Sequence, residues 1–518
     1  MATEAVPLAR PFRRLRSKGD VLGAGLQALA DSDPTCCLRS EDHSEDKKHD
    51  DQRAQKADDD GQQPCDTINE TMLEIMPFDK FMLLILAARK MSQLGPITLS
   101  TACSGTDLVV ACLLRLMPQI ALYTGHSVSI EHVWSCESEA WKRAWITINT
   151  SVPTIFQDLF QIHGQKAINQ DGHLEAVADS LWFIAGFSCK SLSKLNRWRS
   201  TYANCIEQGC GTTGSTFAGV CAFLRKRLPL FLILENVASM GKHNIEEVIA
   251  RLRDIGYHCT DIVMNARLHG LPMSRQRVYF IGCLVPSKCQ QRSEQLKLQR
   301  FAEQTEMQLR VDPLPLSKFL LPEEHPLFQS FIQDFTKRPR KLRRTSNWEE
   351  KHKAIFEKNN VVWSANSKHI EDFPYAIAFS DRQLSVFHYN METVALGSHA
   401  DQYIWDANLS IDFSGRCAPK VSLSCCLTGS SIPIIRWGNS ARSCRPLLGP
   451  EALQLQGLMA SDCPGILGFT NGELWDLSGN AFSGGCANTA AMILMLAFAE
   501  DIPSSASEVQ QRRRDAAS

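Results

Sequence analysis

The sequence predicts an α/β fold in which a parallel sheet is covered by helices on both faces. Between residues 97 and 285, short apolar runs rich in β-branched and aromatic residues alternate with longer stretches of helical periodicity. This alternation is typical of parallel strands joined by helical crossovers. With 518 residues and 44% hydrophobic residues, the chain can bury one large core or two to three smaller ones. Ligands bind such sheets beyond the carboxyl ends of the strands, so functional residues are expected directly after each apolar run.

Composition narrows the class of protein. The chain has 19 cysteines and no apolar secretory segment at its start, which favours reduced thiols in a cytosolic or nuclear compartment. The cysteine spacings do not match a zinc pattern, so we expect no metal. No stretch is long and apolar enough to span a bilayer, so we expect no membrane association. The formal net charge of −1 means that any contact with nucleic acid must come from a local basic patch.

The apolar pattern divides the chain into five parts. Residues 1–65 carry a basic piece and a mixed acidic piece with few aliphatic side chains, which favours a disordered tail because little apolar surface is available to offset the entropy of ordering. A helical pattern follows, with Asn69 and Thr71 as candidate caps, and ends at Gly95–Pro96. It begins the first part of the main domain, residues 66–285.

The strand and helix alternation fails after Val285. Residues 286–440 contain prolines, charge clusters such as KRPRKLRR at 337–344, and aromatic residues without a sustained period, which indicates a second, smaller domain. Residues 441–503 end in a long apolar helical stretch that we expect to pack back onto the first domain. Residues 504–518 are expected to be another disordered tail.

Three strand ends favour a nucleoside ligand. The first run ends in ACSGTDL, where Gly105 permits a tight turn and close backbone approach next to a helix start. Glu137 follows the second run and Asp158 the third, and a carboxylate there can accept hydrogen bonds from ribose hydroxyls. Taken singly, each acid is more typical of a surface carboxylate that a helix dipole stabilises, but three such strand ends in succession favour a ligand.

The fourth and fifth runs end in Cys189 and Glu235. A carboxyl group after the apolar run LFLIL is desolvated, which raises its pKa and lets it carry a proton near neutral pH. We expect the Cys189 thiolate to be favoured by a helix N-terminus, by Lys190 and by the arginines of LPMSRQRVYF. The alternative is that Cys189 is an inert small hydrophobe, as most free cysteines are.

These segments, taken in order, resemble the cytosine carbon-5 methyltransferases. The similar segments cover residues 97–497 and are ACSGTDL, CESEAW, FQDL, GFSCKSLS, LENV, HGLPMSRQRVYFIG, RPLLGPEALQLQGL and SGNAF. Each is moderately specific, and eight in the family's order make a coincidence improbable. The long segment between FIGC and RPLL falls where this family has its target-recognition domain.

The resemblance implies a Rossmann-like class I methyltransferase sheet, S-adenosyl-L-methionine as cofactor and double-stranded DNA as partner. It implies catalytic roles for Cys189 as the nucleophile at cytosine carbon 6, for Glu235 as the acid at ring nitrogen 3, and for Arg277 and Arg275 at the base carbonyl. The implied cofactor-binding residues are Cys103, Ser104, Gly105, Thr106, Asp107, Glu137, Asp158, Leu159, Ser188, Asn480 and Ala481. The reacting base has to leave the helical stack.

Several residues depart from the family pattern. Ser188 stands where a proline is usual, which puts the stiffness of the nucleophile loop in doubt, and Lys190 replaces a glutamine. Cys103 replaces an aromatic residue and Asp107 the second glycine of the cofactor loop, so stacking on adenine is weakened and the turn is altered. The groups required for chemistry are retained.

Three functions follow from this pattern. The first is a DNA cytosine-5 methyltransferase that acts in the nucleus. In this function the basic run 337–344 binds DNA phosphates, although a solvated surface loop explains the run equally well. The second is the same chemistry on tRNA, since SCCLTGS at 424–430 faintly resembles a motif of tRNA-modifying relatives. The third is an inactive methyltransferase-like binding or regulatory protein, which the changes at Ser188 and Asp107 support.

Overall fold

The computed structural model describes residues 63–193, 196–337, 347–363, 367–393, 403–408, 411, 423–424, 432–437 and 440–517. Residues 1–62 of the expected tail, 338–344 of the basic run and 425–430 of the SCCLTGS segment lie outside these ranges.

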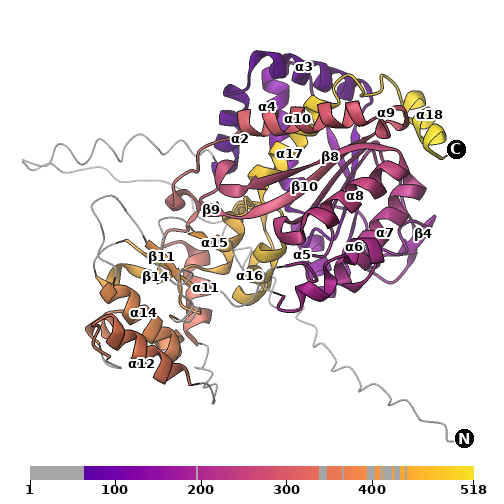
Figure 1. Ribbon diagram of the computed structural model, residues 1–518. Helices are drawn as coiled ribbons and strands as arrows, with labels where there is room; N and C mark the ends of the chain where they lie inside the picture. The colour runs from indigo at the N-terminus through magenta and orange to yellow at the C-terminus, as the bar shows by residue number, and fades with distance from the viewer. Residues whose placement is uncertain are drawn as a thin grey trace, which may run out of the picture. The chain divides into compact units, whose positions relative to one another are not determined.

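A seven-stranded sheet forms the centre of the fold, in the order β3-β2-β1-β6-β7-β10-β8 (Figure 1). Its strands are β1 (Ile97–Ala102), β2 (Ile130–Cys136), β3 (Ile155–Phe156), β6 (Trp182–Gly186), β7 (Phe231–Val237), β8 (Tyr257–Asn265) and β10 (Gln276–Leu284). The runs predicted as strands therefore all contain sheet strands. The order turns from descending to ascending between β1 and β6, which is the switch point where ligands bind in open α/β sheets.

The sheet is mixed, so the prediction of a parallel sheet is wrong for one strand. β3, β2, β1, β6 and β7 run parallel, whereas β10 lies antiparallel between β7 and β8. The connection from Asn265 to Gln276 holds only the turn η3 (Ala266–Leu268) and the two-residue β9 (Met273–Ser274). A parallel crossover needs about a dozen residues or more, usually as a helix, so this chain can only reverse direction.

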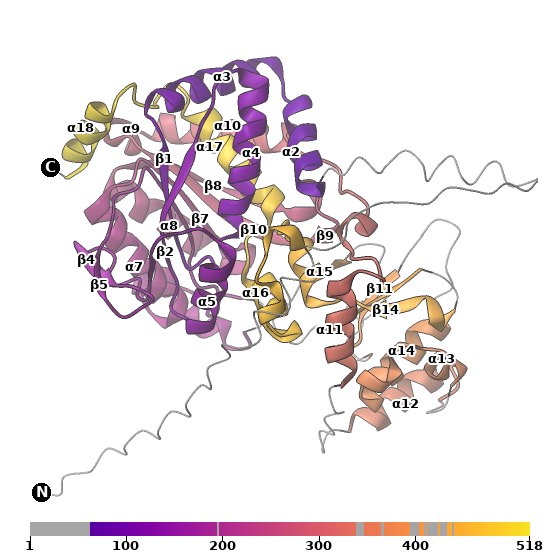
Figure 2. The same ribbon diagram turned by 180° about the vertical axis from the view of Figure 1, so that it is seen from behind.

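Helices cover both faces of the sheet, as predicted. One face carries α7 (Gly211–Arg227) and α8 (Lys242–Ile255), and the other carries α4 (Leu108–Thr124) and α17 (Gly484–Ala497) (Figures 1 and 2). α17 is buried along almost its whole length and contacts α4, β7 and β10. The final apolar helix thus packs against strands of the main sheet. The other helices of the first domain are α2 (Pro64–Glu74), α3 (Phe78–Gln93), α5 (Ala140–Asn149) and the short α6 (Cys205–Gln208), which packs against α7 and α8.

The first helical stretch is divided in two. α2 begins at Pro64 and α3 begins after Pro77, because proline tolerates the first turn of a helix but not its interior. Asn69 lies inside α2 and is buried, where its side-chain oxygen accepts a hydrogen bond of 2.7 Å from Asn488 in α17. The expectation that Asn69 caps the helix is therefore wrong, and the residue ties α2 to α17.

Two segments differ from the prediction. α10 (Arg292–Gln308), after α9 (Pro286–Cys289), packs against β8 and α17, so the sheet's helical cover extends beyond residue 285. The expected tail at 504–518 forms α18 (Ala506–Ala517). Its Val509 is buried, and Arg513 binds Asp179 at 3.0 Å and the carbonyl oxygen of Ser180 at 3.1 Å. These contacts order a segment whose own sequence is polar.

The middle segment carries a second, three-stranded sheet in the order β11-β13-β14. Its elements are α11 (Pro326–Lys337), α12 (Trp348–Lys358), α13 (Lys368–Glu371), α14 (Asp381–Thr393), β11 (Tyr403–Asp406), β13 (Pro433–Arg436) and β14 (Cys444–Pro446). β14 lies beyond the predicted boundary at 440, because it pairs with β13. The chain then forms α15 (Gly449–Gln454) and α16 (Asn471–Asn480). Two further strand pairs lie outside these sheets. β12 (Leu423–Ser424) pairs with β9, and β4 (Lys166–Ile168) pairs antiparallel with β5 (Leu174–Ala176).

Candidate active site

The candidate site lies at the carboxyl ends of β1, β6 and β7. Ala102 pairs with Ala185, and Gly186 pairs with Glu235, so the loop after β1, the loop after β6 and Glu235 emerge side by side. A β-carbon at Gly186 would come within 3.1 Å of the Cys103 carbonyl oxygen and 3.7 Å of Glu235 Oε2. The sheet order thus brings the predicted cofactor loop and the predicted acid to one place.

Glu235 forms an ion pair with Arg277. Arg277 Nε lies 2.9 Å from Glu235 Oε1, and both side chains are largely buried. The antiparallel register explains this contact: Tyr279 stands opposite Glu235, and Arg277, two residues away on β10, presents its side chain on the same face. Burial raises the pKa of the Glu235 carboxyl, and the charges of Arg277 and Arg275 oppose that rise.

Cys189 is half-buried beside this ion pair. Burial and the negative charge of Glu235 raise the pKa of the Cys189 thiol, while Arg277 and Arg275 act in the opposite direction. The charges of Glu235, Arg277 and Arg275 therefore all act on the Cys189 thiol. The expectation of a favoured thiolate is wrong, because desolvation outweighs the arginines.

Neither Lys190 nor a helix N-terminus supplies the predicted help to Cys189. Lys190 is exposed, and its charge lowers the pKa of Glu139 instead. Residues 190–193 form a turn in which Leu192 and Ser193 donate backbone hydrogen bonds to the Cys189 carbonyl oxygen. Arg277 on β10 and Arg275, which directly precedes that strand, are thus the cations that favour the thiolate.

Arg275 has a different position from the one predicted. Its side chain is 2% exposed, and its guanidinium donates to the carbonyl oxygens of Gly479, at 3.0 and 3.1 Å, and of Ala481, at 2.6 Å. These bonds hold the SGNAF segment against the arginine motif. We therefore assign Arg275 to positioning this segment and leave Arg277 as the arginine beside Glu235.

Asn236 is a site residue to which sequence reasoning gave no role. Its side-chain amide donates to the Phe187 carbonyl oxygen at 2.9 Å and to the Ser188 carbonyl oxygen at 3.4 Å. Asn236 is fully buried and directly follows Glu235 in an apolar strand. A buried amide needs partners, so an asparagine at the end of such a strand was a signal that it binds a neighbouring loop.

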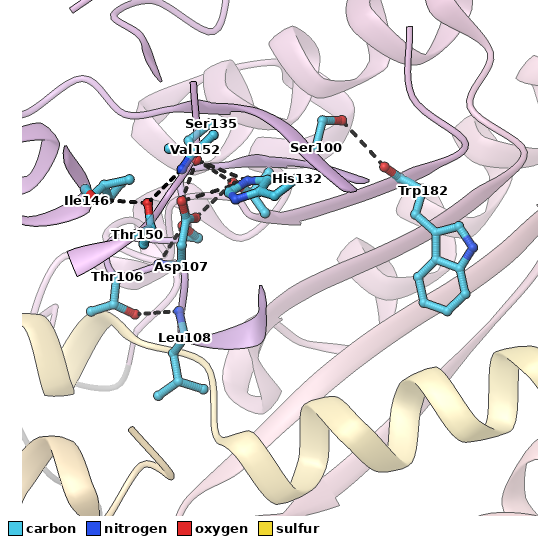
Figure 3. Close-up of polar contacts among 12 residues, drawn as sticks. Ser100, Thr106, Asp107, Leu108, His132, Ser135, Ile146, Thr150, Val152 and Trp182 are labelled. Carbon is cyan, nitrogen blue, oxygen red and sulfur yellow. Dashed lines mark hydrogen bonds and ion pairs between the residues drawn. The ribbon is translucent and has the colours of Figure 1, made fainter. Parts of the chain in front are cut away.

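The cofactor loop is organised around Asp107 (Figure 3). Cys103 and Asp107 both have positive φ, 53° and 54°, which is uncommon for residues other than glycine. The Asp107 carboxylate is fully buried and accepts hydrogen bonds from Thr101 at 2.8 Å, from Ser104 and from Ser135, and His132 Nε2 lies 4.0 Å away. Asp107 thus keeps the backbone conformation that suits glycine, and its carboxylate points into the protein interior.

The other predicted cofactor residues surround this loop. Glu137 is buried at the end of β2, and burial raises its pKa; its Oε1 accepts from the Glu139 N–H at 3.0 Å, and no described residue bonds to Oε2. Asp158 accepts from the Phe160 N–H at 2.9 Å, while Leu159 is buried. Gly105, with φ of 72°, faces Asn480, whose β-carbon lies 3.7 Å from where a side chain would begin.

These residues fit S-adenosylmethionine. A buried carboxylate with one oxygen left over is suited to a ribose hydroxyl, and the glycine turn between β1 and α4 lets a ligand approach the backbone. The structure brings together Cys103, Ser104, Gly105, Thr106, Glu137 and Asn480. Thr106 also accepts from the Leu108 N–H at 3.2 Å, and the Ala481 carbonyl is used by Arg275.

We expect Asp107→Asn to weaken S-adenosylhomocysteine binding by about tenfold, because an amide cannot accept all the hydroxyl donors that surround it. Isothermal calorimetry measures the affinity, and thermal unfolding reports stability. Thr101→Ser, which keeps a hydroxyl on Asp107, serves as the control. Asp107→Gly relaxes the backbone but removes the carboxylate, so it should bind weakly as well. Wild-type affinity in both Asp107 variants would contradict the role given to this carboxylate.

The charge of Arg277 predicts how the rate of Cys189 alkylation depends on pH. The rate of Cys189 alkylation follows the thiolate fraction, so it rises with pH through a pKa above that of an exposed thiol. Arg277→Met removes a charge that favours the thiolate, so the profile should move to higher pH. Arg277→Lys keeps the charge and should leave the profile close to wild type. Mass spectrometry of the Cys189 peptide after iodoacetamide treatment gives the rates; a profile that does not move in Arg277→Met refutes the electrostatic coupling.

The described ranges contain neither a metal-binding cluster nor a membrane-spanning helix. No group of three or more His, Cys, Asp or Glu side chains there is arranged to hold a metal ion. None of the described helices is long and apolar enough to cross a membrane.

Comparison with known proteins identifies the family. Residues 123–458 match the model of the C-5 cytosine-specific DNA methylases. The chain is 25% identical over 415 residues to the DNA (cytosine-5-)-methyltransferase DMT5 of Cryptococcus neoformans, covering 74% of this chain and 16% of that protein. It is 30% identical over 108 residues to the type II methyltransferase M.BanI of Aneurinibacillus aneurinilyticus, covering 20% of this chain and 23% of the relative. The chain thus spans less than a quarter of each relative's length.

Solved structures with a similar arrangement include two methyltransferases. S. pombe Dnmt2 aligns with a TM-score of 0.38 at 12% identity, over 77% of this chain and 98% of that one. Entamoeba histolytica EhMeth aligns with a TM-score of 0.40 at 12% identity, over 79% and 99%. The family match covers more than half of the chain and includes Cys189, Glu235 and Arg277, and the chain therefore belongs to the C-5 cytosine-specific DNA methylases.

Proposed function

We propose that this chain is a DNA (cytosine-5-)-methyltransferase that methylates carbon 5 of a cytosine turned out of the DNA duplex. The observation that carries the proposal is the ion pair between Glu235 on β7 and Arg277 on β10, beside Cys189 in the loop that follows β6. A nucleophile, an acid and a cation in one partly buried place are what addition to a pyrimidine ring requires. When bound, S-adenosylmethionine supplies the methyl group.

The residues of the site have separate tasks in this reaction. The Cys189 sulfur forms a bond to carbon 6 of the base, which makes carbon 5 electron-rich. Glu235 holds a proton at ring nitrogen 3, so negative charge does not accumulate on the ring, and its raised pKa suits this task. Arg277 keeps Glu235 in place, and we assign to its charge the stabilisation of the base carbonyl oxygen.

The cycle ends with release of the enzyme. Carbon 5 takes the methyl group, its proton then leaves to a base, and the electron pair of that C–H bond expels the Cys189 sulfur from carbon 6. No net oxidation or reduction occurs, and the thiol is regenerated. Because carbon 6 is inaccessible within a stacked duplex, the cytosine has to be extruded, which costs a few kcal/mol.

The surface next to Cys189 suits a polyanion. The segment that follows the nucleophile carries Lys190, Arg197 and Arg199, all exposed. Trp198 is 62% exposed, and the Arg197 guanidinium lies 5.2 Å from its ring. Cations neutralise phosphates and an exposed indole stacks on bases, so we place the nucleic acid along this segment.

A mechanism-based trap tests the proposal. Duplex DNA containing 5-fluorocytosine has no carbon-5 proton to lose, so incubation with S-adenosylmethionine should leave a covalent adduct at Cys189. Denaturing gels and peptide mass spectrometry detect it. A tRNA with the same substitution tests the alternative substrate, and trapping on tRNA alone would replace DNA by RNA in the proposal. No adduct with either, together with intact cofactor binding, would favour a regulatory protein.

We also propose that the protein acts in the nucleus, where its DNA substrate would be. This placement is supported by the substrate and by the DNA methyltransferase relatives. Fluorescence microscopy of the tagged full-length chain tests it.

A further inference from the structure

The Cys189 loop is fastened to helix α7. The Ser188 N–H donates to Thr216 Oγ1 at 3.1 Å, and the Ser191 N–H donates to Thr213 Oγ1 at 3.1 Å. In return, the Thr213 N–H donates to Ser191 Oγ at 3.3 Å. The loop residues on either side of the nucleophile are therefore each bonded to a threonine of one rigid helix.

Glycines allow this helix to approach the loop. A β-carbon at Gly211, the first residue of α7, would lie 2.7 Å from Ser191 Oγ. A β-carbon at Gly214 would lie 2.1 Å from the Cys205 carbonyl oxygen. Both distances are shorter than a carbon–oxygen contact allows, so Gly211 lets α7 approach the loop, and Gly214 lets α7 approach Cys205 at the start of α6.

The bond from Ser188 depends on that residue not being proline. Proline has no N–H and cannot donate to Thr216. The Thr216 hydroxyl itself donates to the carbonyl oxygens of Thr212, at 2.8 Å, and Thr213, at 3.1 Å, so its lone pairs are directed at the loop. In this loop, the hydrogen bond from Ser188 to α7 therefore replaces the constraint that a proline ring would impose.

We propose that Thr216 is a positioning residue for the nucleophile, which holds Cys189 at its place in the site through the Ser188 N–H. This inference rests on the proposed function for its catalytic consequence. It answers the doubt raised by the serine: the loop keeps a defined conformation because side-chain hydroxyls of α7 constrain it. Misplacing a reacting atom by about 1 Å can cost 10²-fold in rate, so a single anchor has a large effect.

Thr216→Val tests the anchor, because it removes the hydroxyl and keeps the shape of the side chain. We expect kcat to fall on the order of tenfold while KM for DNA and for S-adenosylmethionine stays unchanged, since only the geometry of the reacting state is altered. Thr216→Ser retains the hydroxyl and should restore kcat. Ser215→Ala is the matched control, because among the described residues the Ser215 hydroxyl bonds only to the Thr212 carbonyl oxygen. Equal kcat in Thr216→Val and Ser215→Ala overturns the proposal.

Restoring the family's proline gives a second test. In Ser188→Pro the ring carbon takes the place of the amide hydrogen, so it is crowded against Thr216 Oγ1. We expect this single variant to lose activity, and Ser188→Pro combined with Thr216→Ala to recover part of it. A Ser188→Pro variant as active as the wild type, with Thr216 intact, contradicts the anchor.

Hydrogen–deuterium exchange separates this proposal from the proposed function. The Ser188 amide should exchange faster in Thr216→Val than in Ser215→Ala, with no substrate present and with unchanged thermal unfolding. This result supports the anchor even if the chain methylates nothing. Identical exchange of the 181–193 peptide in the two variants overturns the anchor, whereas lack of trapping in the wild type affects only the proposed reaction.

Discussion

Replacing Cys189 by alanine is expected to lower methyl transfer to DNA by roughly 10⁴-fold or more and to abolish the 5-fluorocytosine adduct. Without the sulfur, carbon 5 of cytosine is too weak a nucleophile to accept the methyl group. Transfer of a labelled methyl group to duplex DNA measures the rate. The alanine variant should bind S-adenosylhomocysteine and unfold like the wild type, because Cys189 is only half-buried and lies outside the sheet.

The control for this prediction is another thiol of similar exposure. Cys210 is also half-buried and lies at the start of α7, where its sulfur is 3.3 Å from Gln208 Oε1. Cys210→Ala should retain both transfer and trapping. Normal transfer by Cys189→Ala would remove the basis of the proposed chemistry, whatever the rest of the site looks like.

Replacing Glu235 by glutamine is expected to slow methyl transfer by about 10²–10⁴-fold, the range that general acid–base groups contribute. Glutamine keeps the shape of the side chain and an oxygen that can accept from Arg277, but it cannot give up or hold the proton at nitrogen 3. The loss should appear in kcat rather than in cofactor affinity. Single-turnover transfer at saturating DNA and cofactor measures it.

The same substitution should make Cys189 more reactive. The charge of Glu235 raises the pKa of the Cys189 thiol, so its removal lowers that pKa and increases the thiolate fraction at a given pH. Iodoacetamide should therefore alkylate Cys189 faster in Glu235→Gln while methyl transfer becomes slower. Glu207→Gln, on the surface beside His243, removes the same charge elsewhere and should change neither rate. Parallel decreases in both rates would show that Glu235 acts by holding the structure.

Much of the fold could be predicted because each strand is a short apolar run, which can be recognised from a few neighbouring residues. Each predicted run from residue 97 to 285 contains a strand of the main sheet. The reversal of β10 was less visible, since β8 and β10 look alike as sequences and only the shortness of their connection marks it. The helix α18 could not be predicted from its own residues, because it is held in place by hydrogen bonds to residues far away in the sequence, such as Asp179 and Ser180.

The sequence by itself determined which chemical groups the site contains: Cys189, Glu235 and Arg277 each follow or lie in a strand of the main sheet, in the order of one methyltransferase family. Only the tertiary structure decided what surrounds them. The antiparallel β10 brings Arg277 to Glu235, the fold turns Asp107 inward and Arg275 toward Gly479 and Ala481, and desolvation raises the Cys189 pKa. The physical reason is that a strand end is encoded by neighbouring residues, whereas charges, hydrogen-bond partners and dielectric depend on segments far apart along the chain.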